Sequence, residues 1–219
     1  METYAFWNNK GGTGKTSLAF QSIAMFAETT PNQEVLAIDL CPQANLSELF
    51  LGGLLGNGSD NLHKLQSESV RRSVGGYFQA RLPSPYTMPG PLQPADFLCH
   101  PSEYNDAIPD NVWLLAGDAI VELQANAIST LANTQVPGTN TWLQVIDWLK
   151  DFLTPLQSRF SITFVDANPS FSLYTQIALA SSDYVILPVM ADDSSRRAIQ
   201  NAFALVHGID LPSAIYEQH

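Results

Sequence analysis

Short apolar runs and segments with helical periodicity alternate along most of this chain. The apolar runs, which predict strands, lie at residues 3–7, 35–39, 112–116, 161–166 and 184–189. Apolar positions spaced by three or four residues predict helices at residues 16–28, 45–55, 121–131, 141–153, 173–181 and 195–206. Because strands that alternate with helices are typical of βα units, the pattern predicts an α/β fold, a mostly parallel sheet with helices on both faces.

The alternation breaks between residues 56 and 111. Gly, Ser and Asn become frequent there, and prolines crowd together at positions 83, 85, 89, 91 and 94. We therefore predict a single domain over residues 1–219 with a Gly- and Pro-rich irregular insertion at about 56–111, of the kind that is usually functional or mobile. Only a short tail follows the last predicted helix, so we expect the C-terminal part of the fold to be incomplete.

The composition narrows the class of protein. The 219 residues are 45% hydrophobic, enough for one full core, and no apolar run is long enough to span a membrane. The N-terminus shows neither a basic segment nor an apolar leader, which predicts a cytoplasmic location. Cys41 and Cys99 have no metal-ligand spacing, so we expect neither a disulfide nor a zinc site.

The formal net charge of −11 argues against a general attraction to nucleic acid or to anionic lipid. Any contact with nonspecific DNA must then be local. Arg71, Arg72 and Arg81 are the candidates for such contacts, with solvated surface charge as the alternative interpretation.

One loop carries the clearest chemistry. The residues of this loop and of the turn after it are Lys10, Gly11, Gly12, Thr13, Gly14, Lys15, Thr16 and Ser17. They lie between the first predicted strand and the first predicted helix, where backbone N–H groups and the helix dipole can surround a phosphate. Lys15 would reach the outer phosphates and Thr16 would offer a hydroxyl to Mg²⁺. The loop predicts that the chain binds a nucleotide.

Two aspartates end predicted strands. Asp39 and Asp166 each follow an apolar run, and the carboxyl ends of parallel strands meet at one edge of a sheet, beside the phosphate loop. Either residue alone is explained as well by a turn or a helix cap. Together with Thr16 they predict a Mg²⁺ site.

The phosphate loop departs from the generic pattern, which has glycine where this chain has Asn9, and it adds a second lysine, Lys10. In this deviant form it resembles the ParA/MinD family of dimeric ATPases. Residues 38–47 resemble the ParA-type box of hydrophobic-Asp-x-Asp-Pro-Gln-x-Asn. Residues 164–170 resemble the family's second strand that ends in an acidic residue, and residues 185–189 resemble a later strand of the family. The resemblance implies a three-layer P-loop NTPase fold.

The resemblance also implies ATP and Mg²⁺ as cofactors and a homodimer that forms when ATP binds. Lys10 would reach the nucleotide of the second subunit, although it could instead only add charge to its own site. Pro188 and Val189 would lie near the base. Lys10, Lys15, Asp39 and Cys41 would make up the catalytic set.

Cys41 is the sharpest departure, because it stands where ParA-like proteins carry the aspartate that orients or activates the attacking water. A protonated thiol is a poor substitute for a carboxylate. We therefore predict slow hydrolysis, or that another acid acts instead, with Asp118, Asp192 and Asp193 as candidates.

The sequence favours a ParA-like, ATP-dependent dimerisation switch in plasmid or chromosome partitioning or in cargo positioning. A partner protein would stimulate hydrolysis, and no membrane would be involved, since no amphipathic terminal helix is present. The protein would be cytoplasmic, with nucleoid association possible through DNA. The alternative is a hydrolysis-poor regulatory or assembly module that works in its nucleotide-bound state. A small-molecule kinase is a third hypothesis.

Overall fold

A computed structural model describes residues 1–190, 196–197, 199–200 and 204 of the 219-residue chain. Most of the helix predicted at 195–206 lies outside the described residues. So do Asp192 and Asp193, two of the three acids considered as substitutes for Cys41.

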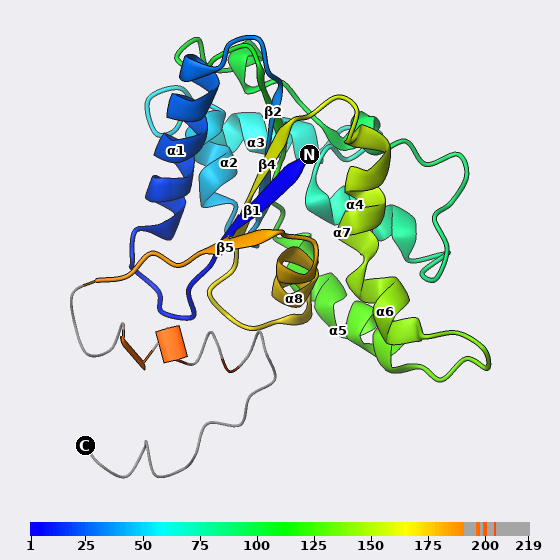
Figure 1. Ribbon diagram of the computed structural model, residues 1–219. Helices are drawn as coiled ribbons and strands as arrows, with labels where there is room; N and C mark the ends of the chain where they lie inside the picture. The colour runs from blue at the N-terminus through cyan, green and yellow to red at the C-terminus, as the bar shows by residue number, and fades with distance from the viewer. Residues whose placement is uncertain (191–195, 198, 201–203, 205–219) are drawn as a thin grey trace.

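Parallel strands form a single sheet in the described part of the chain (Figure 1). The strands are β1 (Glu2–Phe6), β2 (Val35–Leu40), β3 (Val112–Leu115), β4 (Ile162–Ala167) and β5 (Tyr184–Ile186), in the spatial order β3-β2-β4-β1-β5. Since all pairs are parallel, every strand ends at the same edge. The register places Asp39 of β2 opposite Asp166 of β4, which brings the two predicted metal ligands together.

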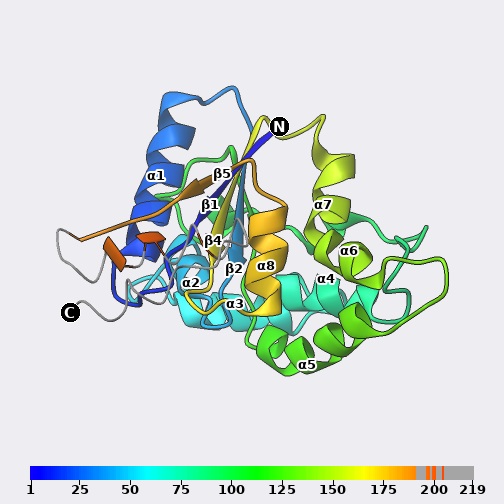
Figure 2. The ribbon, with the colours of Figure 1, turned by 60° about the horizontal axis from the view of Figure 1, so that its bottom comes forward.

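Helices cover both faces of the sheet, as Figure 2 shows. One face carries α1 (Lys15–Thr29), α2 (Asn45–Phe50) and α3 (Gly58–Gln66); the other carries α4 (Val74–Arg81), α5 (Ile120–Asn133), α6 (Thr141–Ile146), α7 (Trp148–Leu153) and α8 (Leu173–Ala180). Short 3₁₀ turns lie at η1 (Pro94–Phe97), η2 (Pro101–Glu103) and η3 (Thr154–Leu156). The predicted three-layer α/β architecture is confirmed.

The alternation of side chains along each strand explains the two cores. Phe6 and Ala37 point into the cluster under α1, whereas their neighbours Trp7 and Ile38 point into the larger cluster under α4 to α8. Successive strand residues face opposite sides of a sheet, so a strand buried on both faces must be apolar throughout. All six residues of β2 are buried, and five of them are apolar; the buried Asp39 is the exception.

The prediction of an irregular insertion at 56–111 is wrong in its first half, because α3 and α4 lie there. Glycine normally disfavours a helix interior, but two glycines of α4 are required by close packing. A Cβ at Gly75 would come within 2.3 Å of Ile120 Cγ2, and one at Gly76 within 2.0 Å of the Arg71 carbonyl oxygen. Composition alone could not separate these glycines from those of a loop.

Three predicted boundaries also change. The helix predicted at 45–55 ends at Phe50, because the chain turns at Gly52 and Gly53, whose φ angles are 124° and 57°. The helix predicted at 141–153 is divided at Asp147 into α6 and α7. The last strand is shorter than predicted and ends at Ile186.

Candidate nucleotide site

The loop between β1 and α1 has the backbone form that an anion site needs. Gly12 and Gly14 adopt left-handed φ angles of 75° and 77°, and a Cβ at either position, or at Gly11, would meet nothing within 4 Å. No side chain caps the start of α1 at Lys15, and no acidic residue lies in its first turn. The first N–H groups of the helix are therefore available to an anion.

Lys15 and Thr16 both bind one carboxylate at the end of β4. The Lys15 ammonium forms a hydrogen-bonded ion pair with Asp166 Oδ1, and the Thr16 hydroxyl donates to Asp166 Oδ2 at 2.8 Å. The Asp166 side chain is completely buried, whereas Lys15 also lines a cavity above the loop. The structure thus brings together the predicted phosphate-binding lysine and two of the predicted metal ligands.

Asp39 lies beside this cluster and is also completely buried. Its Oδ2 accepts hydrogen bonds from the Ser47 amide at 2.9 Å and the Ser47 hydroxyl at 2.8 Å, and its Oδ1 accepts one from the Cys41 amide at 3.1 Å. Burial, followed by the neighbouring charge of Asp166, raises the pKa of Asp39 to about 7. Two buried carboxylates therefore lie side by side, and of the two it is Asp166 that pairs with Lys15.

This surplus of buried negative charge and oxygen atoms fits a hard cation such as Mg²⁺. Thr16 and Asp166 would supply oxygen ligands, while Asp39, whose oxygens already accept hydrogen bonds, would support the same site from behind. The described residues contain no cluster of three or more metal-ligating His, Cys, Asp or Glu side chains. The remaining ligands of such an ion would be phosphate oxygens and water, as is usual for Mg²⁺.

A cavity of about 310 Å³ opens above the loop. It is lined by Lys10, Gly11, Gly12, Thr13, Gly14, Lys15, Thr16, Ser17, Cys41, Gln43, Asn45 and Pro169. All eight predicted loop residues are among them. Within this lining the Asn45 amide donates to the Gln43 side chain at 3.3 Å.

Cys41 lines the cavity but is only 6% exposed. Its sulfur lies 3.8 Å from Asn168 Oδ1, and burial raises the pKa of the thiol to about 11. A thiol with this pKa stays protonated at neutral pH and cannot act as a general base. Asp118 does not replace it, because this carboxylate accepts hydrogen bonds from Arg71 Nη2 at 2.9 Å and from the Ser73 hydroxyl at 2.6 Å.

Asn8 is a site residue that the sequence analysis missed. It is 2% exposed; its Oδ1 accepts a hydrogen bond from the Lys10 amide at 2.9 Å, and its Nδ2 donates to the Pro188 carbonyl at 2.6 Å. Its amide therefore joins the phosphate loop to the segment after β5. Val189, predicted with Pro188 to lie near the base, is half exposed.

Ser47 is the second missed residue. It is completely buried, and besides its two bonds to Asp39 its hydroxyl accepts a hydrogen bond from the Gly117 amide at 2.8 Å. A Cβ at Gly117 would lie 2.9 Å from the Asp39 carboxyl carbon. Ser47 lies between Leu46 and Glu48 in α2, so the local sequence carries no signal of its role.

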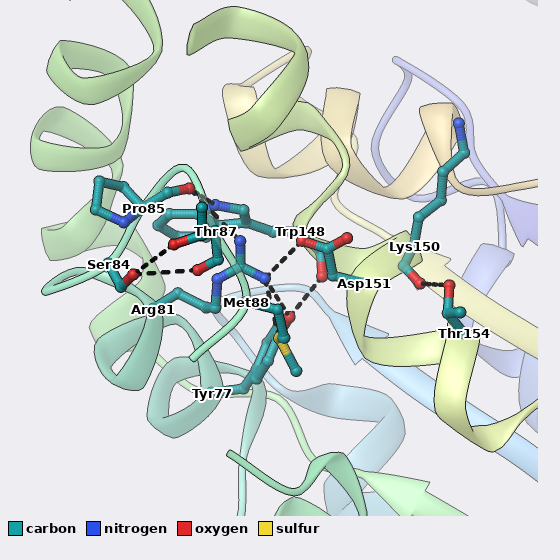
Figure 3. A network of polar contacts seen from close by, with 10 residues as sticks. All are labelled: Tyr77, Arg81, Ser84, Pro85, Thr87, Met88, Trp148, Lys150, Asp151 and Thr154. Atoms are coloured by element: carbon teal, nitrogen blue, oxygen red, sulfur yellow. Dashed lines mark hydrogen bonds and ion pairs between the residues drawn. The ribbon is translucent and has the colours of Figure 1, made fainter. Parts of the chain in front are cut away.

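The arginines considered for DNA contacts are all held within the fold. Arg81 is completely buried and pairs with Asp151, so the prediction that it could contact DNA is wrong (Figure 3). Arg71 pairs with Asp118, and Arg72 pairs with Glu68. No helix in the described residues is both long and apolar enough to cross a membrane.

These features define a nucleotide-binding domain of the P-loop type. A family model described as an AAA domain matches residues 101–213, just over half of the chain. The chain belongs to this family, and its match to a partition protein supports a place with the ParA/MinD type. The matched segment contains β3, β4 and β5 but begins after the phosphate loop.

The chain is 27% identical over 206 residues to the chromosome partitioning protein ParA of Myxococcus xanthus, which covers 93% of this chain and 56% of that protein. A McdA variant of Cyanothece, solved with ATP, matches with a TM-score of 0.68 at 19% identity, over 95% of this chain and 64% of that one. Cobyrinic acid a,c-diamide synthase of Mycobacterium smegmatis, solved with ADP and magnesium, matches with a TM-score of 0.65 at 23% identity, over 95% and 67%. The chain thus spans little more than half of its ParA relative, and the structural matches show the fold.

Proposed function

We propose that this chain is an ATP-dependent dimerisation switch of the ParA type, which acts in DNA partitioning or in positioning another cargo. The observation that carries the proposal is the arrangement of Lys15 and Thr16 on one buried carboxylate, Asp166, directly beneath an open glycine loop. The ParA relative and the ATP complex of the McdA neighbour support the choice of nucleotide.

Within this proposal, Lys15 exchanges partners. Its ammonium lines the cavity, so it can leave Asp166 for the outer phosphates of a nucleotide. Asp166 and Thr16 would then be free to hold Mg²⁺, which would supply charge neutralisation at the phosphates. Asp39 keeps its bonds to Ser47, and a bound cation would return the pKa of Asp39 toward its ordinary value.

Lys10 makes the proposed switch dimeric. The backbone N–H of Lys10 donates a hydrogen bond to the Asn8 side chain, which fixes the backbone at this position. Lys10 lines the same cavity as Lys15. A nucleotide that bonds to Lys10 of a second copy stabilises the dimer by its differential affinity for that form. Hydrolysis at this interface, stimulated by a partner protein, would reset the switch.

One observation favours a second candidate function. Because the thiol of Cys41 is protonated at neutral pH, the described site lacks a base at this position. A hydrolysis-poor regulatory or assembly module, whose ATP-bound dimer is the working state, fits this feature. Single-turnover hydrolysis by Cys41→Asp and by the wild type separates the candidates: we expect the variant to be faster, and equal rates would show that Cys41 does not limit hydrolysis.

The partners and location follow the same proposal. Nonspecific DNA is a candidate scaffold because the ParA relative is a chromosome partitioning protein, and the cytoplasm, with the nucleoid, is the corresponding location. Since Arg71, Arg72 and Arg81 form ion pairs within the fold, we do not assign DNA contacts to them.

The decisive experiment measures molar mass by light scattering with and without ATP and Mg²⁺. We expect ATP to double the mass of the wild type. Lys15→Ala should fail to bind ATP, whereas Lys10→Ala should bind ATP and remain a monomer; Lys150→Ala, an exposed lysine, is the matched control. A wild-type protein that binds ATP as a monomer would refute the dimerisation switch.

A further inference from the structure

The turn between α2 and α3 holds two leucines in solvent. The side chains of Leu54 and Leu55 are both fully exposed. The turn, residues 51–58, is closed by backbone hydrogen bonds of 2.7 to 2.9 Å, and the amide of Asn61 donates to two of its carbonyl oxygens at 2.9 and 3.1 Å. A turn fixed in this way pre-organises the leucines for a contact, because little entropy remains to be lost on binding.

A cavity of about 470 Å³ lies beside these leucines. The first turn of α1 contributes Thr16 and Ser17, α2 contributes Glu48 and Leu49, and the turn and the start of α3 complete the lining, with Leu54 among them. Leu49 is itself 38% exposed. Leu49 and Leu54 are the apolar side chains of an otherwise polar and glycine lining, and Leu55 follows Leu54 in the turn. We call the cavity and the pair together the leucine groove.

The leucine groove is acidic. Glu48 and Asp60 line it, and no Lys, Arg or His is among the lining residues. In the described part of the chain neither carboxylate forms an ion pair. An occupant that buries the leucines and also carries positive charge would match both properties of the surface.

We propose that the leucine groove is the docking site of a partner protein, which binds through a segment with Lys or Arg beside bulky apolar side chains. Charge complementarity selects this occupant. An anionic membrane surface would be repelled by Glu48 and Asp60, and a second copy that met this groove with its own groove would bring the same carboxylates together.

The groove adjoins the nucleotide site. Thr16, Ser17 and Asn45 line both cavities, so a docked segment touches residues that would contact the phosphates and the metal. The segment is thus placed to sense or alter nucleotide occupancy. This coupling rests on the proposed function, whereas docking itself does not.

The test uses fluorescence anisotropy of a labelled peptide in which leucine and lysine alternate, and of a second peptide in which glutamate replaces each lysine. Binding is measured first without nucleotide. We expect the wild type to prefer the lysine peptide, and Leu54→Ser/Leu55→Ser and Glu48→Gln/Asp60→Asn each to weaken its binding about tenfold.

Two matched controls lie away from the groove. Leu123→Ser/Leu143→Ser removes two exposed leucines from α5 and α6, and Asp106→Asn/Asp110→Asn removes two exposed carboxylates. Both should bind the peptide as the wild type does. Equal losses in the controls, or no preference between the peptides, would overturn the proposal.

Other occupants give different results. A Leu54→Ser/Leu55→Ser variant that binds ATP but no longer dimerises would assign the groove to a second copy. Loss of binding to phosphatidylglycerol vesicles in the same variant would assign the groove to a membrane. Either result overturns the proposal. Peptide affinity is then measured with ATP and Mg²⁺. Peptide binding by a protein that does not bind ATP would refute the proposed function and leave docking intact.

Discussion

Two buried cations are each paired with a carboxylate, one at the nucleotide site and one in the core between α4 and α7. At the nucleotide site the carboxylate of Asp166 is completely buried and Lys15 borders the cavity. In the core the guanidinium of Arg81 is completely buried, and the carboxylate of Asp151 is 34% exposed. The cation that borders a cavity can exchange its partner for an anion, whereas in the core only the carboxylate reaches solvent, so that site is closed to an anion.

The two cations also differ in the number of contacts that hold them. Arg81 donates to Asp151 at 2.7 Å and to the Tyr77 hydroxyl at 3.3 Å, and it lies 5.3 Å from the ring of Trp148 (Figure 3). These contacts fix it among aromatic side chains from two helices. Lys15 has glycines before it and an open cavity above it. A buried charge with many partners therefore stabilises a structure, whereas one with a single partner beside a cavity is suited to binding.

The largest expected effect is on folding at Arg81. In Arg81→Met the ion pair and the bond to Tyr77 are lost, and removing one partner of such a pair should lower the free energy of unfolding by about 3 kcal/mol. Urea unfolding measures this change, with Arg72→Met, from an ion pair with the partly exposed Glu68, as the control. ATP affinity of the folded variant should not change. A loss below about 1 kcal/mol would place Arg81 with ordinary surface charges.

The next effect is on binding at Lys15. Lys15→Gln removes the charge that would meet the phosphates, and we expect ATP affinity to fall about 100-fold, since charge-assisted contacts of this kind contribute most in a water-poor site. Calorimetric titration measures the affinity, with Lys150→Gln as the control. If Lys15→Gln lowered the free energy of unfolding by more than it weakened the free energy of ATP binding, Lys15 would serve stability as Arg81 does, and the contrast between the two cations would be wrong.

A third prediction concerns the thiol of Cys41. Burial raises its pKa from 9.0 to about 11, so the folded state favours the protonated thiol. This stabilisation of the folded state is complete below pH 9 and is lost as the pH rises toward 11. At pH 8.5 alkylation of Cys41 should be more than about tenfold slower in the folded than in the unfolded protein. Peptide mass spectrometry after timed iodoacetamide treatment checks this. Equal rates would contradict a buried thiol.

The smallest expected effect is at Asp118, whose partner Arg71 is 32% exposed. Burial alone would raise the pKa of Asp118, but the hydrogen bonds from Arg71 and Ser73 outweigh burial and lower it from 3.8. The stabilisation is therefore present above pH 3.8 and is lost as the pH falls further. Asp118→Asn should cost about 1 kcal/mol at pH 7, measured by urea unfolding, and less at pH 3. A cost that does not depend on pH would exclude the ion pair as its cause.

Local patterns predicted the sheet and the centre of the site. Alternation of strands and helices sets the parallel arrangement, and parallel strands must end at one edge, so the proximity of Asp39, Asp166 and the glycine loop followed from the sequence. The ion pair between Lys15 and Asp166 did not. It joins residues that are 151 positions apart and depends on which strand lies beside β1.

Other features depended on packing that no local pattern reports. Composition predicts a loop at the glycines of α4, which instead let other segments of the chain pack at close range. The sequence around Arg81 predicts an accessible charge, because nothing near it indicates Asp151 or Trp148 as partners. The roles of Asn8 and Ser47 depend equally on distant partners, Pro188 and Gly117.

The side-chain amide of Asn8 holds one end of the phosphate loop. Its bonds to the Lys10 amide and the Pro188 carbonyl brace the chain against the strand at the edge of the sheet, and Lys15 is braced on the other side by Asp166. We therefore expect any backbone adjustment to an anion at residues 11–14, where Gly12 and Gly14 already use φ angles that other residues avoid. These four residues lie between a contact to the segment after β5 and a contact to Asp166 of β4.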